Sequence, residues 1–158
     1  MPVPADRHQQ HRHVVLRAQM GHVVGPACRL VRVLLGPERT VPYEAMIHES
    51  VLRTRVADRR VAVAQLDELL SQSERPNVSL RVIPFGVDGF AGAGAMMLYA
   101  GGRVPALDTV QRDAPYGSVF LDASAQLLAM RTLFRRVESA ALPPAKSRDY
   151  IHRLTKEL

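Results

Sequence analysis

The stretch from Asn77 to Phe85 constrains the fold more than any other part of the chain. Its sequence, Asn-Val-Ser-Leu-Arg-Val-Ile-Pro-Phe, alternates polar positions with the apolar residues Val78, Leu80 and Val82. This alternation is typical of a half-buried strand. Pro76 ends the helical pattern before it, and Pro84 cannot donate a hydrogen bond to a neighbouring strand. The stretch therefore predicts a strand over residues 78–84.

The segment before this strand predicts a strand and a helix. Residues 43–48 alternate in the same way, and Asp58 precedes a helical pattern over residues 59–73 with its apolar side chains on one face. A strand, a helix and a second strand in this order predict a βαβ unit with parallel strands. Glu49 continues the inner face of the first strand, so its carboxylate either points inward or lies at a frayed end in water.

The segment after the strand is rich in glycine. Residues 86–94 match neither the dinucleotide-binding fingerprint nor the phosphate-binding Walker pattern, so we expect no nucleotide there. Gly101 and Gly102 then separate two apolar runs, which predicts a hairpin of strands at residues 95–100 and 104–110. Residues 112–118 are predicted to form a loop.

Two helices are predicted in the C-terminal third. Asp122 is the expected N-cap of a long helix over residues 122–142, in which apolar residues recur every three or four positions. Pro143 and Pro144 end it and begin a final helix. The whole pattern predicts an α+β fold: a small mixed β-sheet with a βαβ unit and a hairpin, packed by two to three helices.

The positive charge is concentrated near the N-terminus. The chain has a net charge of +6, and residues 1–40 hold six arginines against Asp6 and Glu38. We expect residues 1–28 to be a disordered or poorly ordered basic segment, and residues 29–158 to form a single α+β regulatory domain. Residues 27–35 are expected to form a short helix at the start of that domain.

The residue types of catalytic and metal sites do not combine into a site. His8, His11 and His13 lack the further ligands of a structural zinc site, so no metal is predicted, and no cofactor either. No protease or hydrolase signature is present, so we expect that the protein is not an enzyme. With one cysteine, Cys28, and no long apolar run or signal peptide, the expected location is the cytoplasm, without membrane association.

Several segments, in order and spacing, resemble a known family. From about residue 29 to residue 158, the chain resembles the C-terminal domain of unknown function of Xre-family helix-turn-helix transcriptional regulators, which are antitoxin-like. The segments that carry the resemblance are Tyr43–Arg53, Gln65–Leu70, Asn77–Val78 with Val82–Phe85, Pro105–Val110 and the break at Leu142–Pro144. The chain departs from the family pattern at its start, where the helix-turn-helix is missing.

The resemblance implies a regulatory or effector domain that binds a protein partner or a small ligand, and a homodimer is consistent with it. The alternative is a DNA-binding transcriptional regulator that acts through its basic N-terminus or through a separate DNA-binding chain. Phosphate contacts from a basic tail carry no base information, so we expect no sequence-specific DNA binding by this chain alone. DNA is expected to be a partner only indirectly or through the missing helix-turn-helix.

The candidate binding site is the surface around the loop between Phe85 and Met96. The loop is rich in glycine and carries Phe90, an aromatic residue with little local reason to be there. Glu49 and Asp108 are expected to supply polar anchors if their strands converge on one side of the sheet. The alternative is that Phe90 packs on the core and that the two acids pair with arginines such as Arg53 or Arg112.

Overall fold

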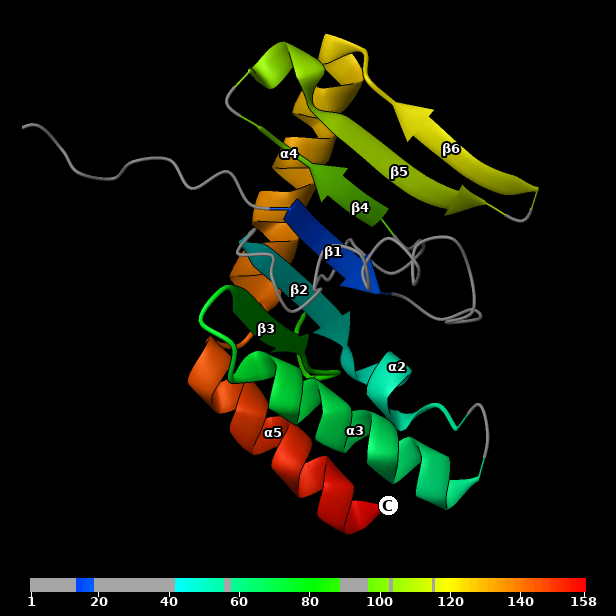
Figure 1. The fold of residues 1–158 in the computed structure, drawn as a ribbon, viewed down its shortest axis with the longest axis vertical. Coiled ribbons are helices and arrows are strands. Elements are labelled where there is room, and N and C mark those ends of the chain that lie inside the picture. The colour runs from blue at the N-terminus through cyan, green and yellow to red at the C-terminus, as the bar shows by residue number, and fades with distance from the viewer. Residues whose placement is uncertain (1–13, 19–41, 56–57, 89–96, 103, 115) are drawn as a thin grey trace, which may run out of the picture.

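The computed structural model describes residues 14–18, 42–55, 58–88, 97–102, 104–114 and 116–158. These residues form one mixed β-sheet whose six strands have the order β3-β2-β1-β4-β5-β6 (Figure 1). The strands are β1 (Val14–Ala18), β2 (Tyr43–His48), β3 (Val78–Ile83), β4 (Met97–Ala100), β5 (Thr109–Ala114) and β6 (Gly117–Leu121). The helices are α2 (Glu49–Arg53), α3 (Arg59–Ser73), α4 (Ser124–Ala140), α5 (Pro144–Glu157) and the 3-10 turn η1 (Pro105–Leu107).

The βαβ half of the sheet agrees with the sequence prediction. β2 and α3 have the predicted bounds, β3 ends one residue before the predicted end, and β2 and β3 are parallel with Tyr43 opposite Val78. Asp58 caps α3, because its carboxylate accepts a hydrogen bond of 2.9 Å from the backbone N–H of Val61. The predicted α+β class is confirmed.

The centre of the sheet was not predicted. Val14–Ala18, which the sequence analysis placed in the poorly ordered segment, form β1, parallel to β2 and antiparallel to β4. That placement was wrong for these five residues: the missing signal was the long-range pairing with two other strands, which no local pattern reveals. The rest of the predicted segment 1–28, the three histidines and the short helix at residues 27–35 lie outside the described residues.

The second half of the sheet differs from the prediction in three places. β4 and β5 pair as predicted, but residues 105–107 form η1, because a proline fixes its own φ and removes a strand donor. Residues 112–118 are not a loop: β5 continues to Ala114, and a tight turn leads to β6, with Gly117 at a φ of 127°. Asp122 is not the cap of α4, since Ala123 holds that position without a side-chain hydrogen bond.

Helices cover the two faces of the sheet in different places. On one face, Met46, Met97 and Tyr99 pack with Phe134 and Val137 of α4. On the other face, the residues that pack against α3 and α5 come from the α2 end and from β2 and β3: Ile47, Leu52, Leu80 and Val82. Figure 1 shows α4 crossing behind the sheet, while α3 and α5 lie side by side next to β3. The core therefore consists of two hydrophobic clusters separated by the sheet.

Candidate functional site

Glu49 begins α2 directly after β2, and its carboxylate is buried, since the residue is only 4% exposed. One carboxylate oxygen accepts a hydrogen bond of 2.5 Å from Nε of Arg53, and the other accepts one of 2.8 Å from the backbone N–H of Phe85. Tyr150 of α5 adds a side-chain hydrogen bond. Arg53 also forms an ion pair with Glu157, in which Nη1 of the arginine lies 3.0 Å from Oε2 of the glutamate. This Glu49 cluster joins α2, the end of β3 and α5.

The hydrogen bonds decide the protonation state of Glu49. Burial by itself raises the pKa of this carboxyl, but the hydrogen bonds from Tyr150, the Phe85 N–H and Arg53 outweigh it. The net pKa lies below the ordinary value of 4.5, so Glu49 is ionised at neutral pH. The hydrogen bond to Glu49 raises the pKa of Arg53. Burial and the hydrogen bond to Glu49 raise the pKa of Tyr150.

Asp108 lies at the start of β5 and is also 4% exposed. Oδ2 accepts hydrogen bonds from the hydroxyl of Tyr99 at 2.6 Å and from Arg131 of α4 at 2.7 Å, and Oδ1 accepts one from the backbone N–H of Gly102 at 3.0 Å. Arg131 also donates to the Tyr99 oxygen at 2.5 Å and to the carbonyl of Pro105 at 3.4 Å. This Asp108 cluster joins β4, η1 and α4.

The backbone approaches the Asp108 cluster closely at Gly101. A Cβ at this position would lie 3.0 Å from the Tyr99 ring and 3.6 Å from both carboxylate oxygens of Asp108. Glycine therefore lets the turn fold over the carboxylate, so that the next N–H can point at it. The glycine pair that predicted a hairpin also builds the wall of this cluster.

Burial and hydrogen bonding again act in opposite directions. Burial raises the pKa of Asp108, but the hydrogen bonds from Tyr99, the Gly102 N–H and Arg131 outweigh it and hold the pKa below the ordinary 3.8. Burial and the bond to Asp108 raise the pKa of the Tyr99 phenol, and the two acceptors Tyr99 and Asp108 raise that of Arg131. The cluster is thus a carboxylate–guanidinium pair bridged by a neutral tyrosine.

The structure does not bring Glu49 and Asp108 together. β2 and β5 both run antiparallel to β4, so Glu49, at the end of β2, and Asp108, at the start of β5, lie at opposite ends of the strands. The expected convergence of their strands on one side was wrong. Glu49 does lie at the start of the predicted loop, through its bond to Phe85, whereas Phe90 lies outside the described residues.

The pairing with arginine was partly predicted. Glu49 pairs with Arg53, as the alternative interpretation expected, because residues four apart meet on one side of a helix. Asp108 pairs with Arg131 and not with Arg112. The residues that sequence reasoning missed are Tyr99, Tyr150 and Arg131. Only an amphipathic reading of α4 that placed one arginine toward the sheet could have found Arg131.

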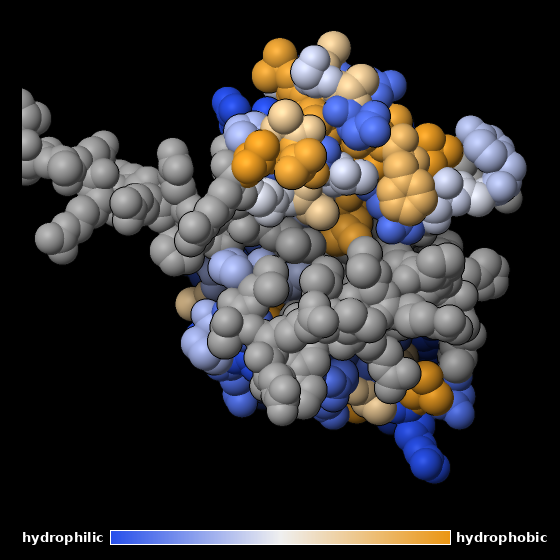
Figure 2. All heavy atoms as spheres, turned by 45° about the horizontal axis from the view of Figure 1, so that its top comes forward, coloured by the Kyte–Doolittle hydropathy of each residue, from blue (hydrophilic) through white to orange (hydrophobic). Residues whose placement is uncertain are grey.

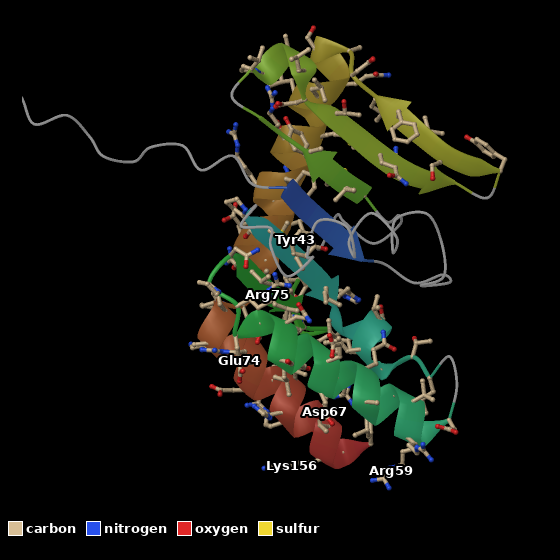
Figure 3. The ribbon with its side chains drawn as sticks, in the orientation of Figure 1. Tyr43, Arg59, Asp67, Glu74, Arg75 and Lys156 are labelled. Carbon is tan, nitrogen blue, oxygen red and sulfur yellow. The ribbon has the colours of Figure 1, made fainter. Side chains whose placement is uncertain are left out.

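A third feature is a group of exposed apolar side chains beside the Asp108 cluster. Leu107, Val104 and Leu128 are 78%, 52% and 60% exposed, and we call them the η1–α4 patch. Leu128 lies one turn before Arg131, which contacts the Pro105 carbonyl, so the start of α4 adjoins η1. Figure 2 shows hydrophobic residues gathered over this end of the molecule. The opposite end is charged, with Arg59, Asp67 and Lys156 exposed on α3 and α5 (Figure 3).

The described residues contain no group of three or more His, Cys, Asp or Glu side chains placed to hold a metal ion. None of the helices among them has both the length and the apolar character needed to cross a bilayer.

Comparison with known proteins assigns the chain to a family. A family model described as Domain of unknown function (DUF5753) matches residues 7–153. The chain belongs to this family. The match begins ahead of β1 and ends in α5, so the family unit includes the central strand that the predicted boundary at residue 28 had left out. No curated protein and no solved structure matches the chain.

Proposed function

We propose that this DUF5753 domain is a regulatory domain of the kind found in Xre-family helix-turn-helix, antitoxin-like regulators, and that it binds a protein partner through the η1–α4 patch. The observation that carries the proposal is the exposure of Leu107, Val104 and Leu128 at one place. Clustered apolar side chains on the surface of a soluble domain are a common mark of a protein contact. The order of the sequence segments that resemble the Xre-family domain supports the regulatory class.

The patch is held in place by the Asp108 cluster. Arg131 is bonded to both Asp108 and the Pro105 carbonyl, so η1 is tied to α4 on the side where Leu128 lies. An apolar surface that is fixed before binding loses little conformational entropy when a partner covers it. In this proposal the buried carboxylate serves to position the binding surface.

The same contacts favour a non-catalytic role for both acids. Each carboxylate uses both of its oxygens to accept hydrogen bonds, and each has a pKa below its ordinary value. A general base at neutral pH needs a pKa raised toward 7 and access to substrate. We therefore propose binding, not catalysis, as the activity.

The test is a pair of surface variants with equal chemistry. The double variant Leu107→Ser/Leu128→Ser changes the patch, and Val61→Ser changes an exposed valine on α3 at the other end of the molecule. Proteins captured by the wild-type chain from its source cells are identified by mass spectrometry, purified and measured against each variant by calorimetry. We expect the double variant to weaken binding at least about tenfold, as the loss of two buried apolar contacts implies.

The control and the contrary outcomes are distinct. Val61→Ser should bind like the wild type, and both variants should keep the wild-type circular dichroism spectrum. Equal binding by the wild type and the double variant contradicts the patch. Sequence-specific DNA binding by the isolated chain in a gel-shift assay at physiological salt contradicts the indirect role of DNA and favours the alternative, a regulator that binds DNA itself.

A further inference from the structure

The two edge strands of the sheet, β3 and β6, differ in whether other segments bond to their outer side. At β3, the backbone N–H of Val82 donates to Oγ of Ser147 at 2.9 Å, and its carbonyl accepts from the N–H of Leu142 at 2.8 Å. Arg81 also donates to the carbonyls of Leu142 and Ala141. The connection between α4 and α5, together with Ser147 of α5, thus occupies the outer side of β3, as an added strand would.

β6 has no such cover among the described residues. No backbone hydrogen bond links it to a described residue outside β5. In the β5–β6 hairpin the hydrogen-bonded pairs alternate from the closing pair Ala114–Gly117, so Val119 bonds back to β5 and Phe120 turns its N–H and C=O outward. The side chain of Phe120 is 65% exposed.

The sequence of β6 lacks the usual protection of an edge strand. Natural edges carry charged residues or proline that prevent pairing with another chain. β6 reads Gly-Ser-Val-Phe-Leu, with neither. Residues 1–40 carry +4 of the net charge of +6, so two copies that meet through residues 41–158 bring only +2 each together. The uncharged strand is a place where they can meet without bringing like charges together.

We propose that β6 pairs with β6 of a second copy of this chain, antiparallel, about a two-fold axis at Val119. A two-fold interface uses the same surface on both subunits, and antiparallel pairing of one strand with itself satisfies this condition. Val119 then faces Val119 of the partner subunit as a non-hydrogen-bonded pair, flanked by hydrogen-bonded pairs of Phe120 with Ser118 of the partner subunit. The two sheets become one sheet of twice the width.

The register is chosen by the residues that flank the strand. With the axis at Val119, Tyr116 faces Asp122 of the partner subunit, and Asp122 faces Tyr116 of the partner subunit. Both side chains are exposed in the single chain, Tyr116 by 86%. The phenol can donate a hydrogen bond to the carboxylate, twice across the axis. Gly117 leaves room beside Leu121 of the partner subunit.

The interface is independent of the proposed partner surface, because β6 contributes no residue to the η1–α4 patch. The experiment measures the mass of the full chain by sedimentation velocity over a wide range of concentration. We expect a dimer for the wild type, a monomer for Phe120→Lys, and a dimer for Val61→Lys, which places the same charge on exposed α3. Lysine on an edge strand opposes pairing by charge.

A cysteine pair tests the axis directly. In a Cys28→Ser background, Val119→Cys places two thiols across the axis, where the Cα separation of about 4.5 Å in a non-hydrogen-bonded pair suits a disulfide. Leu128→Cys is the control, with an exposed thiol on α4. Mild oxidation should cross-link the first variant and leave the second a monomer on a denaturing gel.

The outcomes decide the proposal in every case. A wild-type chain that is monomeric at all concentrations overturns it, and so does a dimer that Phe120→Lys leaves intact. If Phe120→Lys fails to fold, as circular dichroism would show, the cysteine variants decide: selective cross-linking at residue 119 supports the axis, and equal or absent cross-linking overturns it.

Discussion

Glu49 and Asp108 are buried carboxylates at opposite ends of the sheet, and the same three kinds of group donate hydrogen bonds to them. Among the described residues, each buried carboxylate accepts hydrogen bonds from a tyrosine, an arginine and a backbone N–H. A buried charge is tolerated only when it is paired and its oxygens are bonded, so both sites meet this condition fully. The difference lies in where the partners come from.

The Glu49 cluster is partly local and the Asp108 cluster is not. Arg53 is four residues from Glu49 in the same helix and has a second carboxylate, Glu157, to bind. Arg131 is 23 residues from Asp108, and within the described residues Asp108 is its only acidic partner in an ion pair. A local pair can re-form when one contact is lost, whereas Arg131 lies on a different element from Asp108 and has no second carboxylate among the described residues.

The largest effect is therefore expected for Asp108→Asn. The substitution removes the charge that Arg131 and the Tyr99 hydroxyl both bond, while keeping the shape of the side chain. We expect the free energy of unfolding to fall by about 2–3 kcal/mol, below the full cost of breaking a buried pair because Arg131 is partly exposed. Urea denaturation followed by circular dichroism measures the change, with Asp67→Asn on exposed α3 as the matched control.

A loss no greater than that of the control would show that Asp108 is not a stabilising ion-pair partner. The proposed function adds a second readout. If Asp108 positions the η1–α4 patch, Asp108→Asn should also weaken partner binding under conditions where the variant remains folded, although residue 108 is buried.

A smaller effect is expected for Glu49→Gln. Arg53, whose side chain is 42% exposed, keeps Glu157 and water as partners, and the amide oxygen of glutamine can still accept the Phe85 N–H. We expect a loss of about 1–2 kcal/mol, typical of hydrogen bonds to a charged group. The same denaturation experiment measures it, and Glu68→Gln on exposed α3 is the control. If Glu49→Gln costs more than Asp108→Asn, the distinction between local and long-range partners does not govern stability.

The features that the sequence predicted are local ones, and those that it missed depend on contacts between distant segments. The bounds of β2 and α3, the parallel pairing of β2 with β3 and the Glu49–Arg53 pair all come from periodicity or from spacing within one helix. The central position of β1, the β6 strand and the Asp108–Arg131 pair depend on contacts between distant segments. The periodicity of a single segment does not show which distant segments it contacts. A proline and two glycines near η1 also made the start of β5 difficult to predict.

The smallest expected effect is a difference in acid sensitivity between the two carboxylates. Both have a pKa in the folded protein below the ordinary values of 4.5 for Glu49 and 3.8 for Asp108. The unfolded chain therefore binds protons first as the pH falls, and the stability that each group contributes above its ordinary pKa is lost as the pH drops toward its folded pKa. We expect the wild type to lose stability steadily below about pH 4.5, and each of Asp108→Asn and Glu49→Gln to flatten part of this fall. Because the ordinary pKa of Asp108 is the lower one, Asp108→Asn should change only the more acidic part of the curve. Thermal melting from pH 7 downward measures it, and curves that run parallel to the wild type for both variants would contradict the lowered pKa values.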